Sequence, residues 1–193
     1  MNEPGQCDQR QWVLSLLEQY ETRLVRYAAR MLGDEDSARD VVQHVFLRLC
    51  ERPPDPSEGR AAQWLFTVCR NRAVDVLRKR KRMSQFEEGA VECQMGREEG
   101  PADTAQRHDL YQRLNRLVAT LPANQREVID LWAEGFSYRE ISEITGDGEG
   151  KLRVLVHRAI KRLRNDPLTQ RMLGGLGAGD NVRANSPGGK VRT

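Results

Sequence analysis

The sequence predicts an all-α protein, in which two small helical domains are joined by a flexible, acidic linker. Apolar residues recur at spacings of three, four and seven, as in amphipathic helices, and alternating runs of β-branched residues are scarce. Charged residues make up 31% and aromatic residues 6% of the chain, which suits short helices with wide solvated faces. A length of 193 residues allows one ordinary domain or two small ones.

The first domain, residues 1–83, is expected to hold three helices. The first helix spans 12–32, and Asp34 or Asp36 is the expected cap of the second helix, which runs over 37–51. The apolar stripe of the second helix comprises Ala38, Val41, Val42, Val45, Phe46 and Leu49.

The third helix starts near Arg60, after a segment at 52–59 whose three prolines end the second helix. It closes on a basic run at 78–82. Its predicted buried side consists of Trp64, Leu65, Val68, Cys69 and Val76. Trp64 and Phe66 ahead of a basic run also suit the stacking of unpaired bases, although a tryptophan at helical spacing is more often part of a core.

Residues 84–109 contain seven acidic and two basic side chains and few apolar ones, so they are expected to form the mobile linker. The Gly-rich tail at 167–193 is expected to be disordered.

The second domain, residues 110–166, carries the pattern of a helix-turn-helix. Its predicted helices cover 110–120, 123–133, 137–146 and 149–165. Ser137 followed by Glu140 forms a capping box at the start of the third of these helices.

The last helix has two predicted faces. Its buried stripe consists of Leu152, Val156, Ala159 and Leu163, and its other face consists of Lys151, Val154, Leu155, Arg158 and Arg162. Lys151 and Arg153 are placed to reach base edges or phosphates in a major groove, while Arg158, Lys161, Arg162 and Arg164 suit backbone contacts. The alternative is a solvated helix surface on a generic bundle.

We expect no catalytic residue, cofactor or metal site. The four cysteines form no CxxC pair, and the three histidines fall on different predicted elements. Cys50 and Cys69 lie on apolar helix faces and are expected to be small buried residues in a reducing cytoplasm. The N-terminus lacks a signal-peptide pattern and no apolar run could span a bilayer, so a cytoplasmic protein without direct membrane insertion is expected.

Four segments together resemble the extracytoplasmic-function branch of the sigma-70 family of RNA polymerase sigma factors. They are DVVQHVFLRL (40–49), WLFTVCRNRAVDVLRKRKR (64–82), LPANQREVIDLWAEGFSYREISEITG (121–146) and VHRAIKRLR (156–164). Their order and spacing match that family. The resemblance implies a region 2 bundle at 1–83 and a region 4 helix-turn-helix at 110–166.

The resemblance also implies roles for individual residues. The surface that docks on the largest polymerase subunit would consist of Asp40, Gln43, His44, Phe46 and Leu47. The minus-ten element would be opened and read as a single strand by Trp64, Asn71, Arg78, Lys79 and Arg80. The minus-thirty-five element would be read as duplex by Ser137, Tyr138, Arg139, Lys151, Arg153, Val154 and Arg158.

The implied partners are core RNA polymerase, promoter DNA and an anti-sigma factor, with no small-molecule substrate. The acidic linker would pass near the RNA exit path of the polymerase. Two residues depart from the family: Glu149 replaces a usually apolar residue, and Leu155 stands where Arg is common. Because an acidic group near phosphates is unfavourable, the minus-thirty-five sequence is left open.

Two other functions remain as alternatives. A regulator that binds duplex DNA without polymerase would share the helix-turn-helix, but it does not explain the segments at 40–49 and 64–82. An enzyme such as a nuclease would need a carboxylate or histidine cluster for a metal, and the sequence shows no such spacing.

Overall fold

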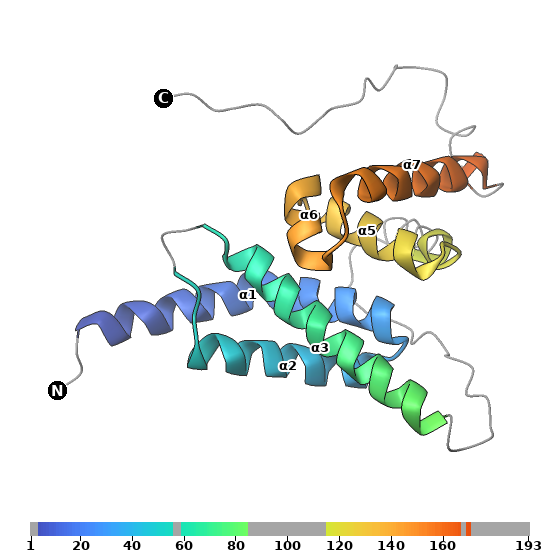
Figure 1. Ribbon diagram of the computed structural model, residues 1–193. Helices are drawn as coiled ribbons and strands as arrows, with labels where there is room; N and C mark the ends of the chain where they lie inside the picture. Colours follow the sequence, from blue (N-terminus) through green and yellow to red (C-terminus); the bar gives the residue numbers. More distant parts are fainter. Residues whose placement is uncertain (1–3, 56–58, 85–114, 167–168, 171–193) are drawn as a thin grey trace, which may run out of the picture. The chain divides into compact units, whose positions relative to one another are not determined.

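The computed structural model describes residues 4–55, 59–84, 115–166 and 169–170 (Figure 1). The helices are α1 (Pro4–Leu32), α2 (Glu35–Glu51), α3 (Ala61–Ser84), α5 (Ala123–Ala133), α6 (Tyr138–Thr145) and α7 (Glu149–Asn165). These residues contain no strand, which confirms the all-α prediction. Nearly all of the predicted linker and tail lies outside the described residues. Within the described helices, none is both long and apolar enough for a membrane span.

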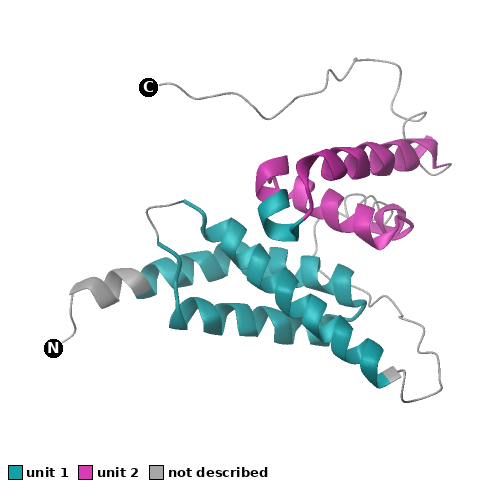
Figure 2. Cartoon of the chain, viewed as in Figure 1, with its two compact units in different colours: residues 1–101, 142–146 teal, residues 102–141, 147–193 magenta. Residues whose placement is uncertain are grey.

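The chain separates into two compact units, coloured in Figure 2. One comprises residues 1–101 and 142–146, and the other comprises 102–141 and 147–193. The helices α1, α2 and α3 belong to the first unit, and α5 and α7 belong to the second.

In the first unit, α1, α2 and α3 pack against one another in all three pairings. Leu24 and Ala28 of α1 and Leu65 of α3 are fully buried. The rings of Tyr27 and Phe66 pack at a tilt, with their centroids 5.3 Å apart. Burying these apolar side chains is the main source of stability for such a bundle.

The start of α2 follows the prediction closely. The Asp34 carboxylate accepts a hydrogen bond of 2.7 Å from the Ser37 amide, as an N-cap does. Gly33, which separates α1 from this cap, has a φ of +79°, a value that glycine adopts without strain. The predicted stripe of α2 is confirmed in full, because Ala38, Val41, Val42, Val45, Phe46 and Leu49 are all buried.

The buried face of α3 differs from the prediction. Leu65 and Cys69 are buried as predicted, but Phe66 and Ala73 complete this face, and Trp64, Val68 and Val76 are only half-buried. Phe66 is fully buried in this core and offers no face to a base. The helical period locates a stripe but leaves its edges open by one position, which accounts for the error.

The two cysteines with described side chains lie in different surroundings. Cys69 is fully buried, and burial raises the pKa of its thiol to about 12. Cys50 is exposed at the end of α2, so the prediction that it is buried is wrong. Its position next to the buried Leu49 places it just outside the apolar stripe.

The predicted bounds of α5 and α7 are confirmed, and these two helices pack on each other. Residues 115–119 are helical, and the rest of the helix predicted at 110–120 lies largely outside the described residues. The capping box at the start of α6 is confirmed. The Ser137 amide donates to the Glu140 carboxylate at 2.7 Å, and the Glu140 amide donates to the Ser137 hydroxyl at 3.3 Å.

Candidate nucleic-acid interface

The exposed strip of α2 is partly as the sequence predicted. Asp40 and Gln43 are exposed, His44 is half-buried, and the Leu47 side chain is 58% exposed. Phe46 belongs to the core with only 9% exposed, so the apolar group that this strip offers to a partner is Leu47. An exposed leucine among polar residues is a composition suited to a helix-on-helix contact.

The basic end of α3 presents most of its charge to solvent. The exposed cations are Arg78, Lys79, Lys81 and Arg82. Asn71, about two helical turns before Arg78, is exposed as well. Asp75 lies 3.7 Å from Arg78, and both side chains are mostly solvated, so this pair holds Arg78 weakly. Exposed cations in successive helical turns can follow the phosphates of a single strand.

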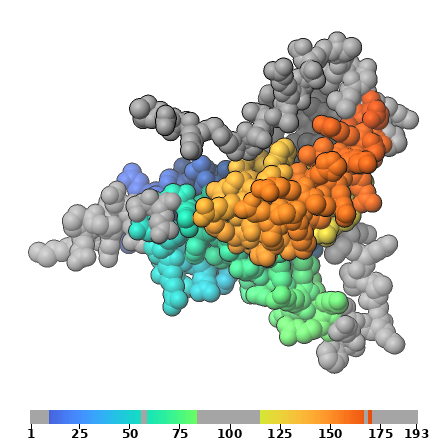
Figure 3. All heavy atoms as spheres, turned by 45° about the horizontal axis from the view of Figure 1, so that its top comes forward, coloured from blue at the N-terminus to red at the C-terminus, as the bar shows by residue number. Residues whose placement is uncertain are grey.

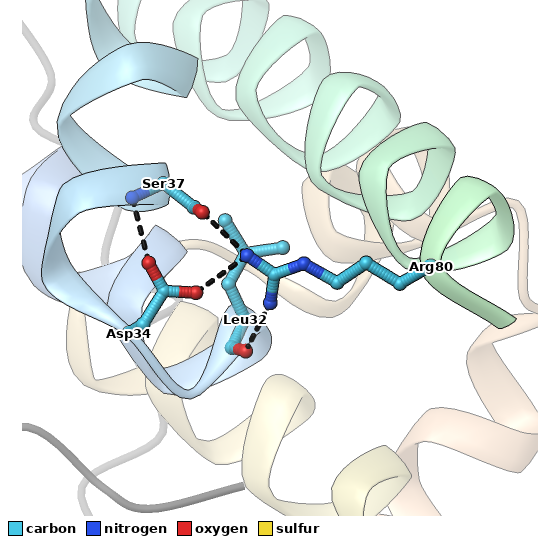
Figure 4. Close-up of polar contacts among 4 residues, drawn as sticks. All are labelled: Leu32, Asp34, Ser37 and Arg80. Atoms are coloured by element: carbon cyan, nitrogen blue, oxygen red, sulfur yellow. Dashed lines mark hydrogen bonds and ion pairs between the residues drawn. The ribbon is translucent and has the colours of Figure 1, made fainter. Parts of the chain in front are cut away.

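Arg80 differs from its neighbours in the same run, because its guanidinium points into the first unit (Figure 4). It donates to the Leu32 carbonyl at 3.1 Å and to the Asp34 carboxylate at 2.5 Å. The Ser37 hydroxyl is its third partner. One side chain of α3 thereby joins the end of α1 to the start of α2.

The Asp34 carboxyl is more acidic than usual. Partial burial raises its pKa, but hydrogen bonds from the Ser37 amide, Arg80 and the Ser37 hydroxyl together outweigh that effect. The net result is a pKa below the ordinary value of 3.8. Asp34 therefore stays ionised at neutral pH and keeps its charge opposite Arg80.

Two acid–base pairs occupy the first turns of α7. Lys151 lies 2.7 Å from the Asp147 carboxylate, and Arg153 lies 2.9 Å from the Glu149 carboxylate. The Arg153 guanidinium also lies over the Tyr138 ring of α6, 5.5 Å from its centroid. Glu149 is thus paired with a cation four residues further along the helix, and this i, i+4 spacing is visible in the sequence.

The helix α7, orange in Figure 3, lies at the surface, and beyond these pairs it carries further exposed cations. Val154 and Arg158 are exposed, and so are Arg139 and Ser137 at the start of α6, as their predicted contacts with DNA require. Leu155 is only 6% exposed, so its predicted place on the outer face is wrong. A shallow groove between α5 and α7 adds two amide residues that sequence reasoning missed; it is lined by Gln125, Arg158, Lys161, Arg162 and Asn165.

No group of three or more His, Cys, Asp or Glu side chains in the described part of the chain is arranged to hold a metal ion.

Comparison with known proteins also finds two separate segments in the chain. The family model for Sigma-70 region 2 matches residues 16–83, and the model for Sigma-70, region 4 matches residues 111–163. The ECF RNA polymerase sigma factor SigL of Mycobacterium tuberculosis is 31% identical over 78% of this chain and 85% of its own length. SigM of Bacillus subtilis, also an ECF sigma factor, is 24% identical over 77% of this chain and 91% of its own length.

A solved structure is also similar to this chain. It contains the sigma factor RpoE of Bartonella quintana in complex with the anti-sigma factor NepR. The match has a TM-score of 0.67 and 28% identity, and it covers 81% of this chain and 94% of that chain. The models for region 2 and region 4 match in that order along the chain, and the relatives align along most of their own length. The chain therefore belongs to the extracytoplasmic-function sigma factors of the sigma-70 family.

Proposed function

We propose that this chain is an alternative sigma factor, which binds core RNA polymerase and directs transcription initiation from specific promoters. The observation that carries this function is the match of both family models, region 2 and region 4, in order along one chain. The exposed basic surfaces of α3 and α7 agree with it, because each family region offers DNA a cationic helix.

Within this function, residues 1–83 would bind the polymerase and open and read the minus-ten element. Residues 110–166 would read the minus-thirty-five element as duplex, residues 84–109 would link the two, and 167–193 would be a tail. Separate family matches at 16–83 and 111–163 support the division.

The polymerase would contact the outer strip of α2. Asp40, Gln43 and Leu47 are exposed there, and Leu47 supplies apolar area. Phe46 would act indirectly, since its burial holds the helix in place. The residue roles stay predictions that follow from this exposure and from the family.

We also propose that the chain has no catalytic activity of its own and works in the cytoplasm. Relatives along most of its length are named as sigma factors, and polymerase and its promoters are found in that compartment. An anti-sigma factor is the proposed regulator, because the similar structure of RpoE was solved with the anti-sigma factor NepR.

The test is a reconstitution with purified core RNA polymerase on a genomic DNA template, followed by sequencing of transcript starts. We expect starts that share two upstream elements. Leu47→Ala should weaken binding to core polymerase and reduce these starts, because it removes exposed apolar area at the proposed contact.

Leu14→Ala is the matched control, since Leu14 of α1 is 59% exposed and Leu47 is 58% exposed. This variant should leave binding to core polymerase unchanged. No binding of the wild-type chain to core polymerase, together with tight duplex binding by the chain alone, would instead support a regulator that acts without polymerase.

A further inference from the structure

One residue near the end of α3, Arg80, makes three hydrogen bonds to the rest of the first unit. Ala73 is the last fully buried residue along α3, and the helix continues for eleven residues to Ser84. Beyond Ala73 the side chains are half-buried or exposed wherever their burial is described. Apolar packing therefore fixes the first half of α3 more firmly than the second half.

Arg80 lies in that second half and makes the contacts that packing does not supply. Its two terminal nitrogens reach the Leu32 carbonyl at 3.1 Å and the Asp34 carboxylate at 2.5 Å, and the Ser37 hydroxyl is a third acceptor (Figure 4). These acceptors are held firmly, because Leu32 ends α1, Asp34 caps α2, and Ser37 lies in the first turn of α2.

The contacts also suit a cation at this place. The carbonyls in the last turn of a helix lack partners within the helix and carry partial negative charge, so a guanidinium beside Leu32 is favourable. A planar fork can bridge separate acceptors, whereas a lysine ammonium is a single point of charge on a flexible stem. Arginine is therefore the side chain that this junction requires.

We infer that Arg80 is a positioning residue for capture of the DNA strand: it fixes the direction of the basic end of α3 and does not itself bind DNA. Arg78, Lys79, Lys81 and Arg82 are the exposed cations whose placement it sets. The inference rests on the proposed sigma-factor function and replaces the direct DNA contact predicted for Arg80 from the sequence.

The experiment measures how tightly holoenzyme, made from core polymerase and the full chain, binds a labelled single strand. The strand carries the minus-ten element mapped in the reconstitution. Arg80→Lys keeps the charge but loses the fork. A positioning role predicts a loss of affinity of about threefold, the scale of a charged contact whose two side chains are two-fifths exposed. A phosphate contact predicts nearly full affinity, because a lysine also binds phosphate as a point charge.

A second variant distinguishes the two roles by how it changes the affinity for the single strand. Asp34→Asn keeps an N-cap, since Asn caps helices as well as Asp, but it removes the ion pair with Arg80. Positioning predicts weaker binding of the single strand. A direct contact predicts unchanged or tighter binding, because the variant removes a negative charge from the DNA-binding unit and releases Arg80.

Glu35→Gln is the matched control, with the same change of charge one residue further on and an ion pair to Arg39 instead. Helical content and binding to core polymerase are measured for every variant. The inference is overturned if Arg80→Lys binds like wild type, or if Asp34→Asn binds like Glu35→Gln. If the wild-type holoenzyme neither starts transcription nor prefers the minus-ten strand, the proposed function fails first and takes the inference with it.

Discussion

Neighbouring cationic side chains at the end of α3 have different surroundings. Arg78 and Lys79 are exposed, while Arg80, the next residue, is half-buried against the junction of α1 and α2. A basic run in a sequence shows how much charge is present, but one helical turn distributes that charge around the axis. Which cation of such a run reaches solvent depends on what packs beside the helix.

The contact between Asp34 and Arg80 predicts a pH dependence. The pKa of Asp34 is lowered in the folded chain, so ionised Asp34 stabilises the fold at pH values above its ordinary pKa of 3.8. This contribution is lost as the pH falls through the lowered native pKa. Asp34→Asn should therefore reduce the free energy of unfolding at pH 7, and the difference from wild type should shrink toward pH 3.

Urea unfolding followed by circular dichroism, at a series of pH values, measures this difference. Both side chains are about two-fifths exposed, so we expect a small effect. A difference that stayed constant from pH 7 to pH 3 would show that the ion pair contributes nothing.

Buried positions were predicted well where the apolar stripe is wide and less well at its edges. The six residues of the α2 stripe were identified correctly. Leu155 and Phe66 were assigned to outer or stacking surfaces, yet both are buried because neighbouring helices cover those edges. Arg80 could not be placed from the sequence either, since its partners at 32, 34 and 37 are more than forty residues away.

At the scale of helices, α7 is divided electrostatically along its length. Two carboxylates pair with Lys151 and Arg153 at its start, so these four charges sum to zero. Further on, Arg158, Lys161 and Arg162 line the groove toward α5. The start of α7 therefore suits discrimination among bases, and its second half suits attraction to phosphates.

Removing one carboxylate at the start of α7 should shift this balance. Glu149→Gln releases Arg153 and leaves a net positive charge, so binding to duplex of unrelated sequence should tighten and depend more steeply on salt, by about 0.9 in the log–log slope. Fluorescence anisotropy with labelled duplex at several salt concentrations measures both quantities.

Glu51→Gln makes the same change of net charge at the exposed end of α2 and serves as the control. A slope that changes equally in both variants would mean that net charge alone, and not the release of Arg153, is responsible.

Helix bounds were predicted best where the sequence contains stop signals. Pro122 precedes α5 and Gly135 follows it with a φ of +96°, and the predicted bounds of that helix are correct. By contrast, α1 begins at Pro4, eight residues before the predicted start. The added residues are mostly polar, so they carry no apolar period by which a helix is recognised.

At the scale of the whole molecule, each helical set has apolar packing of its own. The helices α1, α2 and α3 bury one another, and α5 packs on α7. The family models also match the chain as two separate segments. We therefore expect each segment to fold when it is made alone.

Fragments covering 1–84 and 111–166 test this expectation. Each should give a helical circular dichroism spectrum and a cooperative thermal transition, because each retains its buried leucines. The first fragment should still bind core polymerase. Loss of cooperative unfolding in either fragment would show that its fold depends on the remainder of the chain.

The contacts of Arg80 also limit how this junction can evolve. Charges of a simple ion pair can be exchanged between the two positions, but here one acceptor is the main-chain carbonyl of Leu32, which no substitution removes. An acid at position 80 would face that carbonyl and the negative end of α1. Related sequences can therefore weaken or lose this junction, but they cannot preserve it by exchanging its two charges.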